Sequence, residues 1–516
     1  MSPTPSATAT SQEGGHRNET VIVFALSLAA MVVSMMQTLP VPILGLIRND
    51  LATTTANVSW VTTATLLSAA VFTPLLGRFG DQHGKKPTLV AVLGVMVAGS
   101  VVAALASSLP LLIVGRVLQG AATAIFPLAL SVLREEVRPQ KLPGAMALVS
   151  GTLAFGSGLA LVATGLLTSG ADYRNAFWMA TGFAVLALLA VVFLVPATRH
   201  KTGGRTDFLG ALTLGIALLL LLLPISQGHE WGWASGRTLG SFAGAAVMTA
   251  VWVLTELKVR EPLVDMRMFI HRPVLMANLA GILVGFGMFA NFLGVSYLVQ
   301  MPKALTGYGF DASILRASVE FLLPGAIVSL LASPIGGQLV RHRGPRVALA
   351  LASALGAAGF GWLALDHGHT ASVIGAGLIV GAAVSFGYAA MPAVIMASVP
   401  HHQSGIANGI NSISRSTGSA IGSAIVTTIL ASKTIEHLPA GVPALPAESG
   451  FTLTFTIGAV AFGLVAVISG LGLRGRQGHR AAEGSVPAAA PAAASPTATA
   501  QEAAPAAQAA GQGSAV

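Results

Sequence analysis

Long runs of uncharged, apolar residues constrain this chain more than any other feature. Two clear examples are Leu209–Ile225 and Ala348–Leu365. About 20 such residues, each rising 1.5 Å along a helix, cross the hydrocarbon core of a bilayer. Charged residues make up only 9% of the chain and hydrophobic residues 53%, whereas a soluble domain carries roughly 25% charged residues. The sequence therefore predicts an all-α polytopic membrane protein.

The apolar runs predict about fourteen membrane spans. We place them at residues 20–46, 58–79, 87–107, 110–133, 143–168, 175–197, 207–227, 237–257, 273–300, 316–340, 345–365, 371–399, 404–432 and 450–473. With both termini in the cytoplasm, 20 of the 28 Lys and Arg residues lie in inside loops and six outside. The positive-inside rule therefore predicts a multi-pass protein of the cytoplasmic (inner) cell membrane, with both termini cytoplasmic.

An internal repeat divides the spans into two sets. At an offset of 260 residues, the second set repeats Pro74, Gly77, Gly84 and Lys86 as Pro334, Gly337, Gly344 and Arg346. The repeat predicts two pseudo-symmetric six-helix bundles with two helices inserted between them. The expected units are a disordered N-terminus (1–18), an N-terminal bundle (19–197), two linker helices (198–258), a C-terminal bundle (259–474) and a disordered Ala/Pro-rich cytoplasmic tail (475–516).

Several classes of chemistry are excluded by the residues themselves. The net charge of +9 comes from basic residues in short loops rather than from one patch, so no nucleic-acid partner is predicted. The chain has no cysteine, its loop histidines lack accompanying acid ligands, and it has no Gly-x-x-x-x-Gly-Lys-Ser/Thr phosphate loop. We therefore expect no metal, no cofactor, no enzyme activity and no obligatory protein partner.

Four segments resemble a known family. Gly77–Pro87 is similar to the signature loop between helices two and three of the major facilitator superfamily, and Ile113–Gly120 resembles its helix-four motif. Gly228–Trp233 and Pro262–Phe269 resemble segments of its fourteen-helix drug/proton antiporter branch, a group of multidrug and antibiotic exporters. The resemblance covers residues 20–474. Helix five, Gly151–Ala160, departs from it by lacking the family's Gly-Pro step and Gly-Gly pair.

The resemblance implies a secondary active transporter. It would export small, largely apolar drug- or antibiotic-like molecules by alternating access and proton antiport, so the expected partners are the substrate, protons and the lipid bilayer. An uptake carrier or uniporter of the same fold is the alternative, which the altered helix five keeps open. A membrane receptor without transport activity is the third possibility, although a receptor needs no repeated gate loop.

The first copy of the repeated loop contains the predicted gate. Its residues are Gly77, Arg78, Asp81, Gly84, Lys85 and Lys86. Glycines permit a tight turn and close helix approach. Asp81 is expected to act as a latch that pairs with basic groups or a helix N-terminus in one state and releases them in the other. The alternative is that Asp81 is a solvated loop acid.

Three charged residues are predicted to lie within spans. Arg116 is expected either to take part in proton coupling and cavity electrostatics or to have a structural role, because an unpaired arginine in the bilayer costs roughly 3 kcal/mol or more. Glu320 is the candidate proton carrier, because a partly desolvated carboxyl has a raised pKa; the alternative is an interfacial residue. Arg415 is either its counter-charge or part of a polar packing cluster.

The substrate cavity is expected between the first and fourth helices of each half, as the resemblance implies. Methionine and aromatic side chains make an adaptable apolar wall, although many such residues face lipid or neighbouring helices instead. The candidates are Met35, Gln37, Thr38, Gln119, Phe289, Asn291, Tyr388, Met391 and Asn411.

Overall fold

A computed structural model describes residues 15–53, 55–167, 172–197, 207–259, 262, 264–400, 403–435 and 445–472. Within these residues the secondary structure is helical, apart from one isolated β-bridge between Thr434 and Pro446. The tail predicted to be disordered, 475–516, lies outside the described residues, as does most of the N-terminal segment 1–18. The first helix begins at Gly15, a few residues before the predicted boundary.

The first part of the chain forms its own apolar core. Its elements are α1 (Gly15–Thr38), η1 (Val41–Ile43), α2 (Leu44–Asp50), α3 (Thr55–His83), α4 (Lys85–Ala104), α5 (Leu109–Ala121), η2 (Ala122–Ala124), α6 (Ile125–Glu136), α7 (Leu142–Leu167) and α8 (Arg174–Leu194). Buried apolar side chains from Ile22 to Val195 make one continuous cluster, joined by Met396 from the second part.

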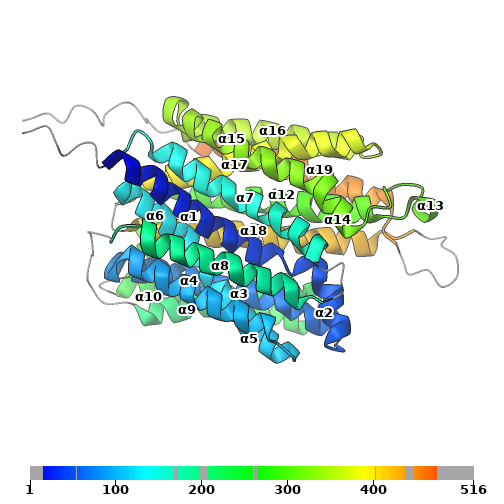
Figure 1. Ribbon diagram of the computed structural model, residues 1–516, viewed down its shortest axis with the longest axis horizontal. Helices are drawn as coiled ribbons and strands as arrows, with labels where there is room; N and C mark the ends of the chain where they lie inside the picture. The colour runs from blue at the N-terminus through cyan, green and yellow to red at the C-terminus, as the bar shows by residue number, and fades with distance from the viewer. Residues whose placement is uncertain are drawn as a thin grey trace, which may run out of the picture. The chain divides into compact units, whose positions relative to one another are not determined.

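The second part adds a separate core. Its elements are α9 (Phe208–Trp231), α10 (Gly236–Lys258), α11 (Met266–Phe269), α12 (Arg272–Gln300), α13 (Lys303–Thr306), α14 (Ile314–Arg316), the π-helical η4 (Ala317–Leu322), α15 (Leu323–Arg343), α16 (Pro345–Leu365), α17 (Thr370–Ser398), α18 (Ser404–Ser432), α19 (Glu448–Val467) and the π-helical η6 (Ile468–Gly472). Buried apolar side chains from Ala280 to Val465 form the second large cluster. Figure 1 shows the long helices side by side, with α2, α13 and α14 at one end.

Twelve helices in the described part of the chain are long and apolar enough to cross a membrane. Two further long helices fall outside this set. The part of α9 whose side chains are described without a gap, Leu209–Ile225, is apolar, and α18 carries Asn408, Asn411, Arg415 and many hydroxyl residues. The protein is therefore an all-helical, multi-pass membrane protein, and the count of fourteen spans stays a prediction for α9 and α18.

The repeated glycines have the same backbone conformation in both copies. Gly84 separates α3 from α4 with a φ of 112°, and Gly344 separates α15 from α16 with a φ of 85°. Residues with a Cβ rarely adopt such positive φ values. Each copy of the repeat therefore ends one long helix and begins the next across a single glycine. We call the end of the helix bundle that contains Gly84 and Gly344 the α3–α4 end.

Two more repeated glycines bring the halves together at the α3–α4 end. A Cβ on Gly77 of α3 would lie 3.1 Å from the carbonyl oxygen of Gly405 on α18. A Cβ on Gly337 of α15 would lie 2.6 Å from the Cα of Gly144 on α7. The two contacts are related by the sequence repeat, so the internal repeat appears in space as a pair of matching junctions between the first and second parts of the chain.

Candidate functional site

A cavity of about 190 Å³ lies between the first and second parts of the chain. Its walls come from α1, α3, α5, α6, α7, α12, α15, α17 and α18, together with the short helical turns beside them. Pockets for drug-sized ligands usually measure about 300–1,000 Å³. The cavity is smaller than this range in the present conformation, so a ligand of that size requires its walls to move apart.

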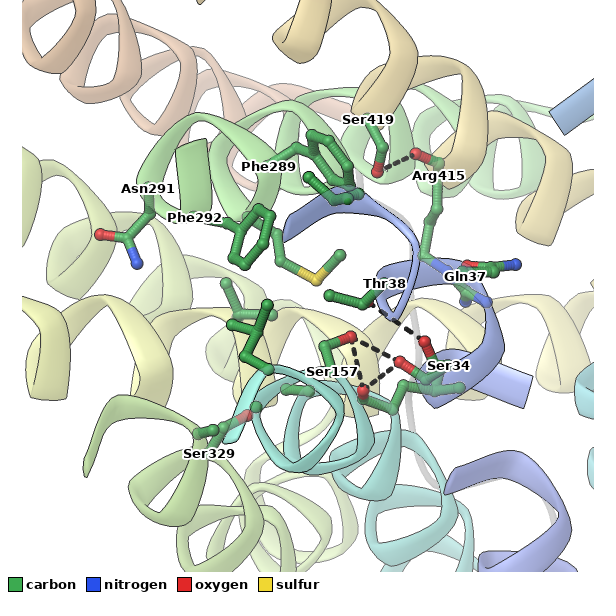
Figure 2. Close-up of a pocket in the computed structure, with 18 of the residues that line it drawn as sticks. Ser34, Gln37, Thr38, Ser157, Phe289, Asn291, Phe292, Ser329, Arg415 and Ser419 are labelled. Atoms are coloured by element: carbon green, nitrogen blue, oxygen red, sulfur yellow. Dashed lines mark hydrogen bonds between the residues drawn. The ribbon is translucent and has the colours of Figure 1, made fainter. Parts of the chain in front are cut away.

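Hydroxyl groups form one wall of the cavity. Ser34 of α1 and Ser157 of α7 lie 2.6 Å apart, oxygen to oxygen, and both donate to the carbonyl of Leu153. Thr38 donates to the Ser34 carbonyl one helical turn away. Figure 2 shows these groups facing the interior between α1 and α7. They give an otherwise apolar wall a small set of donors and acceptors.

Aromatic side chains of α12 form part of another wall. The rings of Phe289 and Phe292 lie 5.7 Å apart, centre to centre, and both line the cavity (Figure 2). The Tyr388 hydroxyl on α17 donates to the sulfur of Met288 at 3.4 Å. Asn291 also lines the cavity, and its buried side-chain oxygen lacks a hydrogen-bond partner among the described residues. This wall can therefore offer a stacking surface, while the Asn291 side-chain oxygen is buried behind it.

Arg415 of α18 lies at the junction of the two parts. Its guanidinium carbon is 4.4 Å from the ring centre of Phe126 on α6 and 4.8 Å from that of Tyr388 on α17. Its Nη1 donates to the side-chain oxygen of Asn411 at 3.2 Å. Asn411 in turn donates to the Ala277 carbonyl and to the Asn278 side chain. Two aromatic faces and one amide thus hold this buried cation in place.

Arg116 of α5 is bound differently. Its Nε donates to the Val61 carbonyl of α3 at 3.0 Å, and its Nη1 donates to the Met36 carbonyl of α1 at 3.0 Å and to Gln119. Pro40 has no N–H, so the Met36 carbonyl lacks the donor that helix α1 would otherwise supply four residues later. Arg116 fills that position, which supports a role in holding α1, α3 and α5 together.

The predicted gate residue Asp81 is buried at the α3–α4 end. Its carboxylate accepts a hydrogen bond from the backbone N–H of Gly405, at the first turn of α18, at 3.1 Å. A carboxylate is stabilised at a helix N-terminus by the exposed N–H groups and the helix dipole. A Cβ at Gly405 would lie 2.6 Å from this carboxylate, so glycine permits the close approach and a larger residue would displace the Asp81 side chain.

Basic residues surround Asp81 and join the same end of the bundle. Lys85 lies 3.9 Å from Asp81 and also pairs with Glu135, while Lys86 donates to the Val192 carbonyl of α8 at 2.9 Å. Arg134 of α6 donates to the Met396 and Val399 carbonyls at the end of α17, at 2.8 and 3.2 Å. The first part of the chain therefore holds the C-terminus of α17 with a cation and the N-terminus of α18 with an anion. Arg134 is not among the gate residues that the sequence predicted.

Glu320 lies away from the cavity. It is in η4 and forms an ion pair with Arg316, one helical turn earlier, at 2.7 Å, with about a third of its side chain exposed. The pairing with Arg415 that the sequence suggested is therefore absent in this structure, because a basic residue four positions away on the same helix is nearer. Its role, as a proton carrier or as an interfacial residue, stays a prediction.

The cavity contains only some of the residues expected to line it. Those that do are Gln37, Thr38, Phe289, Asn291 and Tyr388, and those that do not are Met35, Gln119, Met391 and Asn411. The second set is buried in helix contacts, where Gln119 donates to Ser100 and Asn411 to α12. Lining residues that the sequence reading missed include Ser34, Phe126, Ser157, Ser329 and Ser419. The serines among them could have been predicted from the sequence, because they are hydroxyl residues within otherwise apolar spans.

Membrane-spanning helices around a cavity that two parts of one chain enclose define a membrane carrier. The sequence profile described as Major Facilitator Superfamily matches residues 26–423. The chain therefore belongs to the Major Facilitator Superfamily and is a transporter rather than an enzyme.

The chain is similar to several named exporters. It is 27% identical to the tetracenomycin C resistance and export protein of Streptomyces glaucescens over 428 residues, covering 81% of this chain and 77% of the relative. It is 29% identical to the cephamycin export protein CmcT of Amycolatopsis lactamdurans over 406 residues, covering 75% and 80%. The crystal structure of the human organic anion transporter MFSD10 has the same fold, with a TM-score of 0.63, 15% identity and coverage of 87% of this chain and 99% of that one.

Proposed function

We propose that this protein exports small, largely apolar drug- or antibiotic-like molecules across the cytoplasmic membrane by alternating access. The cavity between the two parts of the chain is the observation that carries the proposal. The names of the similar tetracenomycin C and cephamycin exporters support the direction of transport and the substrate class. In this proposal the α3–α4 end and both termini face the cytoplasm, in agreement with the distribution of Lys and Arg.

The gate at the α3–α4 end supports a two-state mechanism. In the present conformation Asp81 and Arg134 join the first part of the chain to α18 and α17. This end is closed in one state and opens to the cytoplasm when those contacts break. Matching glycine junctions on the two sides of the interface let the halves rock against each other around the cavity.

Proton antiport is the proposed driving force. Asp81 is the candidate proton carrier, because Glu320 does not line the cavity and is paired with Arg316, whereas Asp81 is a buried acid at the junction. Protonation removes the charge that Lys85 and the α18 N-terminus stabilise, and the gate opens. Each pH unit supplies about 1.4 kcal/mol, and each charge moved across 100 mV supplies about 2.3 kcal/mol.

Inverted membrane vesicles test both direction and coupling. Vesicles from cells producing the full chain should accumulate a fluorescent hydrophobic dye when their interior is acidified, and vesicles without the protein should not. Dissipating the pH gradient with nigericin should then stop accumulation. Accumulation that continues without the gradient rules out proton antiport, and an absence of accumulation rules out export.

The proposed latch, in which the Asp81 carboxylate accepts from the Gly405 N–H, can be tested by substitution. Asp81→Asn keeps an acceptor for the Gly405 N–H but removes the charge that favours the helix N-terminus. A hydrogen bond to a charged group contributes about 1.5–3 kcal/mol, and an amide cannot carry the proton, so we expect the initial rate of transport driven by the pH gradient to fall at least tenfold. Glu320→Gln is the matched control, because it neutralises a carboxylate at the periphery, and it should keep more than half of the wild-type rate. Equal effects of the two substitutions contradict the latch.

A potential-driven uniporter is the second candidate. Among the described residues, the cavity lining includes Arg116 and Arg415 but no Asp, Glu or His. A cavity with this charge suits an anion, whose exit from a cell with a negative interior is favoured by the membrane potential. In the vesicle assay, uptake that is abolished by collapsing the potential with valinomycin and potassium, but not by nigericin, supports this candidate.

A further inference from the structure

We propose that Arg415 binds the anionic group of the substrate, so that the preferred substrates are aromatic molecules bearing a carboxylate or phenolate. This inference rests on the proposed transport function and narrows its substrate class. Arg415 lines the cavity, is 5% exposed, and lies where α6, α17 and α18 meet.

The guanidinium of Arg415 has hydrogen-bond donors to spare. An arginine offers five N–H donors in a planar fork. In the described structure, Nη1 donates to Asn411, while Nε and Nη2 make no hydrogen bond to the described residues. Arg116 provides the contrast, since Nε and Nη1 are both bound to protein oxygens and its side chain is 1% exposed. Both arginines line the cavity, and Arg415 keeps more of its donors for a ligand than Arg116 does.

The surroundings of Arg415 leave its charge uncompensated. Its contacts are two aromatic rings and one neutral amide, and no carboxylate lines the cavity within the described residues. Water exclusion strengthens the attraction between a buried cation and an anion, and the guanidinium fork matches a carboxylate with two parallel hydrogen bonds. An anionic ligand therefore supplies the counter-charge that the protein itself lacks.

The rest of the cavity fits the aromatic part of such a ligand. Ser412, Ser416 and Ser419 lie on the same helix as Arg415 and line the same cavity. Phe289 and Phe292 line the same cavity from α12 (Figure 2), and a planar aromatic ring can pack against such side chains. The site thus combines one charged anchor with an apolar wall.

Two dyes with the same xanthene core provide the test. Fluorescein is anionic and rhodamine 123 is cationic at pH 8. Full-length protein in lipid nanodiscs is titrated with each dye, and binding is followed by fluorescence anisotropy. We expect wild type to bind fluorescein at least tenfold more tightly than rhodamine 123. We expect Arg415→Gln to weaken fluorescein binding at least tenfold, to change rhodamine 123 binding less than twofold, and Arg415→Lys to restore part of the loss.

The wild-type comparison needs no variant, so the inference stays testable if Arg415→Gln fails to fold. A wild type that binds fluorescein no more tightly than rhodamine 123 overturns it, as does an Arg415→Gln protein with unchanged fluorescein affinity. Arg48→Gln removes an exposed arginine that contacts Asn49 and should leave fluorescein binding unchanged; an equal loss there would mean that only net charge matters.

The dye-binding experiment tests the anion site independently of the export proposal. Export of rhodamine 123 with no fluorescein binding leaves export in place and overturns the anion site. Fluorescein binding that depends on Arg415, without movement of either dye into inverted vesicles, supports the anion site and contradicts export.

Discussion

Replacing Gly418 with valine is expected to remove most of the correctly folded protein. A Cβ at Gly418 on α18 would overlap the backbone carbonyl of Ile282 on α12, and a Cβ at Gly285 on α12 would overlap the Arg415 carbonyl. Both obstacles are backbone atoms, so no side-chain rotation can relieve them. Overpacking a core costs about 1–3 kcal/mol and occasionally more, and backbone contact across two long helices puts this site at the upper end.

The measurement is the yield of monodisperse protein after extraction, together with its melting temperature. Gly463→Val is the matched control, because Gly463 lies within helix α19 and a Cβ there meets no atom within 4 Å. It introduces the same β-branched residue into a transmembrane helix and should behave like wild type. Similar losses in both variants would show that valine itself, rather than the α12–α18 contact, is responsible.

Replacing Arg116 with alanine is expected to destabilise the first half of the protein strongly. The substitution leaves the buried Met36 carbonyl without a donor, whereas the Val61 carbonyl keeps a hydrogen bond from the Thr65 hydroxyl. Each buried polar group left unsatisfied costs about 1–3 kcal/mol. We therefore expect a clear fall in melting temperature, whereas Arg48→Ala at an exposed site should cause little change.

A second substitution tests whether the hydrogen bond from Arg116 to the Met36 carbonyl causes this loss of stability. Pro40→Ala restores a backbone N–H four residues after Met36, so the Met36 carbonyl gains a donor within its own helix. Arg116→Ala should then cost less in the Pro40→Ala background than in wild type. A double-mutant cycle measures this difference. Additive effects of the two substitutions would show that the bond from Arg116 to Met36 does not stabilise the fold.

The local features of the chain were predictable because their causes are local. Apolar runs determine membrane helices, since the bilayer removes water from every exposed polar group. The repeated Gly84 and Gly344 predicted two equivalent turns, and both have the positive φ that glycine tolerates. Asp81 followed by basic residues predicted a carboxylate beside a helix N-terminus or cations, and both lie next to it.

The cavity could be predicted only in part. Gln37, Phe289 and Tyr388 line it, but Gln119 and Asn411 are committed to neighbouring helices. Sequence periodicity indicates which residues share a helix face, but not whether that face meets a cavity, a helix or lipid. The same limit explains why the predicted ion pair between Glu320 and Arg415 is absent. Glu320 pairs instead with Arg316, one helical turn earlier.

The amino-acid sequence alone thus determined a membrane-embedded helical protein, its family resemblance and its repeated glycine loops, because hydropathy and glycine conformations act over a few residues. Only the tertiary structure distinguished the two buried arginines. The Arg116 guanidinium donates to the backbone carbonyls of Met36 and Val61. The Arg415 guanidinium instead packs between the rings of Phe126 and Tyr388 and keeps N–H donors that make no hydrogen bond to the described residues. Those partners lie far apart along the chain, and it is their packing that decides which charge serves the fold and which is available to a ligand.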